Sequence, residues 1–94
     1  SGVGGAVAEV IGQKIKQVAG RHQVLCITHL PQIAVYGDRH FVVSKREVGE
    51  RTASTVRALG EAERMEEVAR MLGGIKVTDR TREAAAEMLR AAVE

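Results

Sequence analysis

Gln23-Val24-Leu25-Cys26-Ile27-Thr28-His29-Leu30-Pro31-Gln32 is the stretch of this sequence that decides its fold. Residues 24–27 form a short, continuous apolar run rich in strand-forming side chains. Such a run predicts a strand buried on both faces, as in a parallel sheet. Polar residues follow it, and Pro31 favours the first turn of a short helix that extends to about Tyr36 and ends at Gly37. A buried strand followed by a helix indicates the α/β class.

The flanking sequence predicts further helices and a hairpin. Apolar residues recur at helical spacing over residues 6–19, and Gly20 follows where helices commonly stop. Residues 40–45 and 51–57 are two β-rich runs around a segment that contains Gly49, which predicts a hairpin. Residues 61–72 and 81–93 again show helical spacing, and Asp79 is a plausible cap of the last helix.

The chain has 94 residues, which allows one small domain at most. A single strand buried on both faces needs neighbours on both edges. We therefore expect residues 1–94 to be part of an α/β domain whose other strands lie in sequence outside the chain. Val, Ala, Leu and Ile must build the core, because aromatic residues make up only 2% of the chain.

Composition excludes several classes of protein. No apolar run approaches the roughly 20 residues of a membrane span, so we expect no membrane among its partners. One cysteine excludes an internal disulfide framework and fits a reducing, cytosolic compartment. A net charge of +2 is too small to indicate a surface that tracks nucleic-acid phosphates.

His29 is the sharpest candidate for a functional residue. It follows the carboxyl end of the predicted strand, where open α/β sheets place their ligand crevice. A histidine there can donate to a phosphate or carry a proton near neutral pH, or it can simply satisfy local backbone groups. His22 and His40 are expected to be solvated, and Cys26 to be an inert core thiol. No metal-ligand spacing is present, so no metal site is expected.

The opening Ser1-Gly2-Val3-Gly4-Gly5 is a glycine-rich loop. It lacks the third glycine of a dinucleotide fingerprint, and the chain has no Gly-Lys-Ser/Thr triplet of a phosphate-binding P-loop. Two interpretations stay open. The loop is either a flexible entry to the first helix or a place where the backbone approaches a ligand or partner subunit closely.

Four segments together resemble the C-terminal part of the bacterial RecN family, in the SMC-like branch of ABC-type ATPases. They are Ser1-Gly2-Val3-Gly4-Gly5, the run from Gln23 to Ala34, the run from His40 to Lys45, and Glu67-Val68-Ala69-Arg70-Met71-Leu72-Gly73-Gly74. The resemblance covers essentially the whole chain. It implies the C-terminal lobe of a P-loop ATPase head, with a partial sheet, a hairpin and flanking helices.

The resemblance also implies roles for particular residues. Gly2, Val3, Gly4 and Gly5 match the D-loop, which faces the partner head across the nucleotide. His29 matches the switch histidine, which contacts the γ-phosphate near the attacking water, and is the implied catalytic residue. The implied parent binds and hydrolyses ATP with Mg²⁺. Its heads form a homodimer, it acts on DNA in double-strand break repair and recombination, and it works in the cytoplasm at the nucleoid.

Several family motifs are missing from the chain. It has no Walker A lysine, no signature loop and no Walker B Asp-Glu pair. By the family pattern, the Walker B acids would end just before Ser1. Phosphoryl transfer needs such a lysine and a metal-holding carboxylate. We therefore expect a single truncated head domain that needs the missing N-terminal lobe as its partner, and that neither binds ATP tightly nor hydrolyses it alone. The alternative is a free-standing α/β interaction module without nucleotide chemistry.

Overall fold

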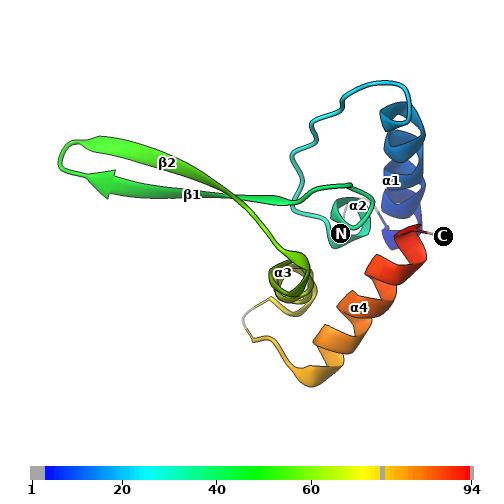
Figure 1. Ribbon diagram of the computed structural model, residues 1–94. Helices are drawn as coiled ribbons and strands as arrows, with labels where there is room; N and C mark the ends of the chain where they lie inside the picture. The colour runs from blue at the N-terminus through cyan, green and yellow to red at the C-terminus, as the bar shows by residue number, and fades with distance from the viewer. Residues whose placement is uncertain (1–3, 75, 94) are drawn as a thin grey trace.

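The computed structural model describes residues 4–74 and 76–93 (Figure 1). Its elements follow one another as α1 (Gly5–Ala19), α2 (Pro31–Ala34), β1 (Phe41–Val48), β2 (Arg51–Ala58), α3 (Glu61–Gly73) and α4 (Asp79–Val93). The fold is α/β, with one antiparallel hairpin and four helices among the described residues. The hairpin and every helix that the sequence predicted are confirmed.

Strands β1 and β2 form a hairpin that extends away from the helices (Figure 1). Its register runs from Phe41 opposite Ala58 to Val48 opposite Arg51. Gly49 turns the chain with φ at +65°, in the left-handed region that glycine adopts without a Cβ clash. Because residues in the strands are almost all exposed, the hairpin contributes little to the core.

The core lies where α3 packs against α4 and α2. Its buried side chains are small and aliphatic, which fits the scarcity of aromatic residues: Val35, Val68, Ala69, Ala85 and Ala92. Ala85 and Ala92 lie seven residues apart on one face of α4, and half-buried Met88 and Leu89 join them. The apolar face predicted for the last helix is therefore the face that packs.

The start of α4 differs from the prediction, which made Asp79 the cap. Thr78 holds that position instead: its hydroxyl accepts from the Thr81 N–H (3.2 Å), and its own N–H donates to the Thr81 hydroxyl (2.9 Å). Asp79 is the first helical residue, and its carboxylate pairs with Arg82. A hydroxyl on each side of the first turn satisfies the helix N-terminus reciprocally, as in a capping box.

The predicted buried strand at residues 24–27 is wrong for this structure. The segment is extended but pairs with no strand among the described residues, and Leu25 and Ile27 are 85% and 95% exposed. Cys26 is exposed too, so it is not a core thiol here. The physical reason is that a strand needs a neighbouring backbone for its hydrogen bonds and a layer to cover its side chains. Within the described residues the two hairpin strands pair only with each other, so the hairpin supplies neither.

Within residues 4–74 and 76–93, no helix is both long enough and apolar enough to cross a membrane.

Candidate functional site around His29

His29 lies in a short turn between the extended segment and α2. The hydroxyl of Thr28 accepts a hydrogen bond from the Leu30 N–H (3.0 Å). This bond joins the two residues on either side of His29. The His29 side chain is exposed. Leu30 is the N-cap of α2, and buried Pro31 fills its first turn, where a missing N–H costs nothing. The turn therefore presents an imidazole to solvent from a backbone that is fixed locally.

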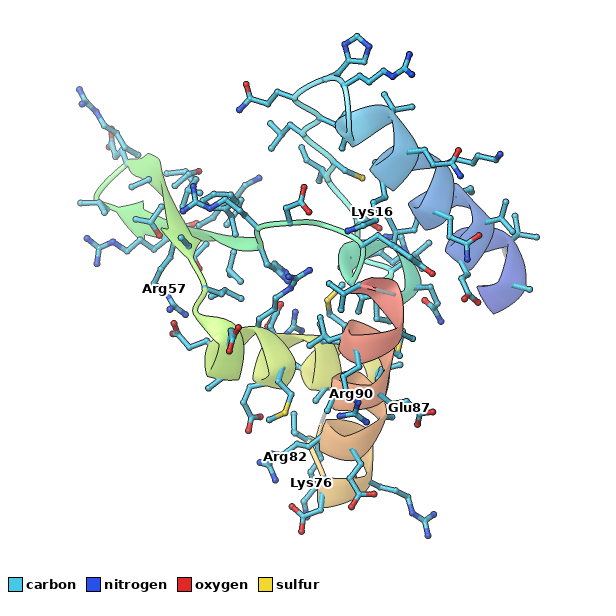
Figure 2. All side chains as sticks on the ribbon, turned by 45° about the vertical axis from the view of Figure 1, so that its right-hand side comes forward. Lys16, Arg57, Lys76, Arg82, Glu87 and Arg90 are labelled. Carbon is cyan, nitrogen blue, oxygen red and sulfur yellow. The ribbon has the colours of Figure 1, made fainter. Side chains whose placement is uncertain are left out.

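One side of α2 is held by α1. A Cβ placed on Gly12 would lie 2.5 Å from Cδ2 of Tyr36 and 3.1 Å from the Gln32 carbonyl oxygen, so the two helices meet at a residue without a side chain. Lys16, labelled in Figure 2, pairs with Asp38 just beyond α2 (Nζ–Oδ1 3.6 Å). These contacts fix the segment after His29 against the first helix.

The other side of α2 is held by Arg64 of α3. Its Nη2 atom donates to the carbonyl oxygens of Ala34 (3.1 Å), Val35 (3.3 Å) and Gly37 (2.6 Å). The last carbonyls of a helix have no intrahelical partner, and here one guanidinium satisfies several of them. Burial lowers the pKa of Arg64 from its usual value, which agrees with a guanidinium that has lost part of its water.

Of the glycine-rich loop, the structure describes only Gly4 and Gly5, which begin α1 beside α2. Gly2 and Val3 lie outside the described residues. Gly4 is the N-cap of α1, and Gly5 is its first residue. Nothing lies within 4 Å of a Cβ built on Gly4, whereas one built on Gly5 would be 3.6 Å from the side-chain nitrogen of Gln32. The amino end of α1 thus lies beside α2, whose Gln32 comes three residues after His29.

His40 is only partly solvated, whereas the sequence predicted a solvated side chain. Its side chain is half-buried, and its Nδ1 atom has no hydrogen-bond partner in the described structure. Burial lowers the pKa of His40 and the nearby Arg64 charge lowers it further, while Glu67 opposes both. His40 lies at the entrance to β1, where the hairpin joins the helical body. The charge state of His40 therefore depends on the fold.

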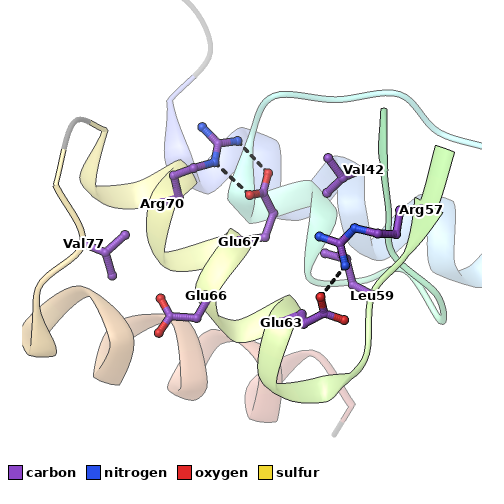
Figure 3. Close-up of a pocket in the computed structure, with 8 residues that line it drawn as sticks. All are labelled: Val42, Arg57, Leu59, Glu63, Glu66, Glu67, Arg70 and Val77. Atoms are coloured by element: carbon purple, nitrogen blue, oxygen red, sulfur yellow. Dashed lines mark hydrogen bonds and ion pairs between the residues drawn. The ribbon is translucent and has the colours of Figure 1, made fainter. Parts of the chain in front are cut away.

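A depression of about 380 Å³ lies between the hairpin base, α3 and the segment before α4 (Figure 3). Its charged side chains pair with one another: Arg57 with Glu63, and Arg70 with Glu67 (Nη2–Oε2 2.6 Å). These arginines lower the pKa of both glutamates. Glu66 pairs outward with Arg82 of α4 (2.7 Å). Because its charges are already compensated, the depression is less suited to an ionic ligand than the exposed His29 turn.

The part of the chain that the structure describes holds no group of three or more His, Cys, Asp or Glu side chains placed to bind a metal ion. The candidate site is therefore one exposed imidazole, the open backbone at Gly4, and the two helices that hold α2 in place. Hydrogen-bond donation to an anion and proton transfer at the imidazole are the chemistry that it can perform.

Sequence reasoning missed Gly12 and Arg64, although both left a signal. An isolated glycine inside a helical pattern often marks close packing. Arg64 lies four residues before Val68 and eight before Leu72, in line with the apolar face of its helix. A cation in that row needs partners, and backbone carbonyls provide them.

No family model matches the chain. It is, however, 48% identical over 89 residues to the DNA repair protein RecN of Halalkalibacterium halodurans. It is 45% identical over 89 residues to RecN of Xylella fastidiosa, and 44% identical over 92 residues to RecN of Bacillus subtilis. These alignments cover 95%, 95% and 98% of this chain, but the chain spans only 16% of each relative. Identity at this level over nearly the whole chain is far more than one motif would give. The chain therefore belongs to the RecN family of DNA repair proteins.

Proposed function

We propose that this chain is the C-terminal lobe of an ATP-hydrolysing, SMC-like head in a protein of DNA double-strand break repair and recombination. The observation that carries the proposal is the exposed His29 at the end of an unpaired apolar strand-like segment, within a sequence 48% identical to a DNA repair protein. Such a protein works in the bacterial cytoplasm, at the nucleoid.

The apolar segment supports the head assignment. Leu25 and Ile27 expose nearly their whole side chains, and Val24 is also exposed. In an open α/β sheet such a run forms a strand between neighbours, and ligands bind at its carboxyl end. His29 would then stand at the ligand crevice once the N-terminal lobe adds the neighbouring strands.

In this proposal His29 donates a hydrogen bond to the γ-phosphate of ATP and orders the surroundings of the attacking water. A neutral imidazole can donate from one ring nitrogen and accept at the other, and an exposed ring can turn to do either. Gly2, Val3, Gly4 and Gly5 form the D-loop against the second head. At Gly4, the open space around the backbone leaves room for that approach.

ATP and Mg²⁺ would be held mainly by residues outside this chain. The sequence has no phosphate-binding Gly-Lys-Ser/Thr, and the described residues offer no metal-ligand cluster. When bound, the metal neutralises charge on the transferring phosphoryl group. This chain contributes an imidazole donor and a glycine backbone surface, so by itself it should bind nucleotide weakly.

The test replaces His29 in the full-length protein. We expect His29→Ala to reduce ATP turnover by about 100-fold, the usual scale for a positioned proton-transfer or donor group. ATP-driven association of the heads should weaken as well. His22→Ala is the matched control, since His22 is exposed in the turn after α1. If turnover and head association both match the wild type in His29→Ala, His29 does not contact the γ-phosphate. The free-standing interaction module would then be the favoured interpretation.

A further inference from the structure

Arg64 is the polar link between α3 and the segment that carries His29. Its Nη2 atom donates to three backbone carbonyls, at Ala34, Val35 and Gly37, with the shortest contact at 2.6 Å. All three acceptors lie at or just beyond the end of α2. One side chain therefore gathers the C-terminal carbonyls of α2 and ties them to another helix.

Apolar contacts reinforce this link. Val35, in the same stretch, is buried and packs in the core with Val68 and Ala69 of α3. Arg64 precedes Val68 by one helical turn, so both point from α3 toward α2. The bonds to Ala34 and Val35 are part-buried and the guanidinium is partly desolvated, so losing this donor would be costly.

The other end of α2 is continuous with the His29 turn. The Leu30 carbonyl accepts from the N–H groups of Ile33 (3.1 Å) and Ala34 (3.0 Å), and the Leu30 N–H donates to the Thr28 hydroxyl. Only these bonds and one short helix lie between Arg64 and His29. A shift of α2 against α3 must therefore move the His29 backbone.

We propose that Arg64 is a positioning residue that fixes His29 for its contact with nucleotide, by anchoring the C-terminal end of α2 to α3. This inference rests on the proposed function of His29. Its physical basis is that a misplacement of about 1 Å at a reacting group can cost roughly 100-fold in rate. Arg64 acts through the backbone and does not touch substrate. It also couples any movement of α3 and α4 to the histidine.

The experiment uses the full-length protein and measures ATP turnover together with hydrogen exchange of residues 28–37. Arg64→Met keeps much of the aliphatic stem and removes the donors. Arg64→Lys keeps the charge and up to three N–H groups on one flexible ammonium. We expect Arg64→Met to lower kcat by roughly 10- to 100-fold with KM for ATP changed less than about 3-fold. Arg64→Lys should recover part of the loss.

Arg70 supplies the matched control. It is an arginine on the same helix, but its guanidinium donates hydrogen bonds to Glu67 of α3 and not to α2. Arg70→Met should therefore leave both kcat and the exchange of residues 28–37 at wild-type values. Of these two arginine positions, only substitutions at Arg64 should make residues 28–37 exchange faster.

A double variant separates positioning from general destabilisation. If Arg64 acts through His29, His29→Ala combined with Arg64→Met should turn over no more slowly than His29→Ala alone. Additive losses, or wild-type kcat in Arg64→Met, would overturn the inference while leaving the proposed function intact. Normal turnover in His29→Ala would remove the proposed function itself. Should Arg64→Met fail to fold, Arg64→Lys decides the question: its kcat must fall while KM holds, and wild-type kcat refutes the role.

Discussion

Gly12 of α1 lies so close to Tyr36 that a Cβ at position 12 would be 2.5 Å from the Tyr36 ring. The same Cβ would also approach the Gln32 carbonyl oxygen to 3.1 Å. The contact brings the first helix onto the short helix after His29. The absence of a side chain at one position therefore determines where the candidate site lies relative to α1.

Replacing Gly12 should separate the two helices. Gly12→Ala gains helix propensity but forces Tyr36 or the α2 backbone to move, and overpacking of this kind costs about 1–3 kcal/mol. We expect a lower unfolding midpoint in chemical denaturation and faster hydrogen exchange in α2. Gly5→Ala is the control in the same helix, because its Cβ would meet only the tip of Gln32 at an ordinary 3.6 Å. It should be neutral or stabilising by about 0.5 kcal/mol. Equal effects of the two variants would contradict the close contact.

Val68 should be the most sensitive aliphatic position in the core. It is fully buried, and shortening it to alanine removes two methyl groups and leaves a cavity between α3 and its neighbours. Val68→Ala should lower the free energy of unfolding by about 2 kcal/mol. Val56→Ala makes the same chemical change on the exposed hairpin, where Val56 is 67% exposed, and should cost less than about 0.5 kcal/mol. A loss at Val56 as large as that at Val68 would place the core elsewhere.

His40 should make the stability of the fold depend on pH. Its pKa is lowered in the folded chain, first by burial and then by Arg64, so the unfolded chain binds the proton more readily. The free energy of unfolding should therefore be constant above about pH 6.5, the ordinary histidine value, and fall as the pH drops below it. Denaturation curves between pH 7.5 and 5 measure this slope. His40→Gln should flatten it, and an unchanged slope in that variant would assign the effect to another group.

Cys26 reports whether the extended segment becomes a strand in the longer protein. Its thiol is exposed in this chain, so it should react readily with a thiol reagent. In the full-length protein the segment should lie within a sheet, and modification of Cys26, located by peptide mapping, should slow strongly. Denatured full-length protein provides the reference rate for an accessible thiol. Modification of the folded full-length protein at that rate would argue against the strand.

Local patterns were sufficient for most elements of the fold. Residues of α1, α3 and α4 alternate apolar and polar side chains with the helical period, and each helix carries its own backbone hydrogen bonds. The hairpin is equally local, since Gly49 brings its two strands together directly. Such elements depend little on distant sequence, and this is why periodicity and turn residues predicted them.

Residues 24–27 show the limit of that reasoning. Their apolar character does indicate a strand, but a strand's hydrogen bonds belong to its neighbours and not to itself. Without a neighbouring strand in the described structure, the same side chains are exposed. His40 and Cys26 were misjudged for a related reason, because burial depends on what other segments cover.

The sequence by itself determined the helices, the hairpin, the family and the candidate histidine, because periodicity, turn residues and a specific motif are properties of neighbouring positions. Only the tertiary structure decided what surrounds that histidine. Gly12 contacts Tyr36, which lies 24 positions further along the chain. Arg64 binds the carbonyls at the end of α2, which lie 27 or more positions before it. Contacts of this kind arise when helices pack, and no local pattern specifies which backbone carbonyls a half-buried guanidinium will bind.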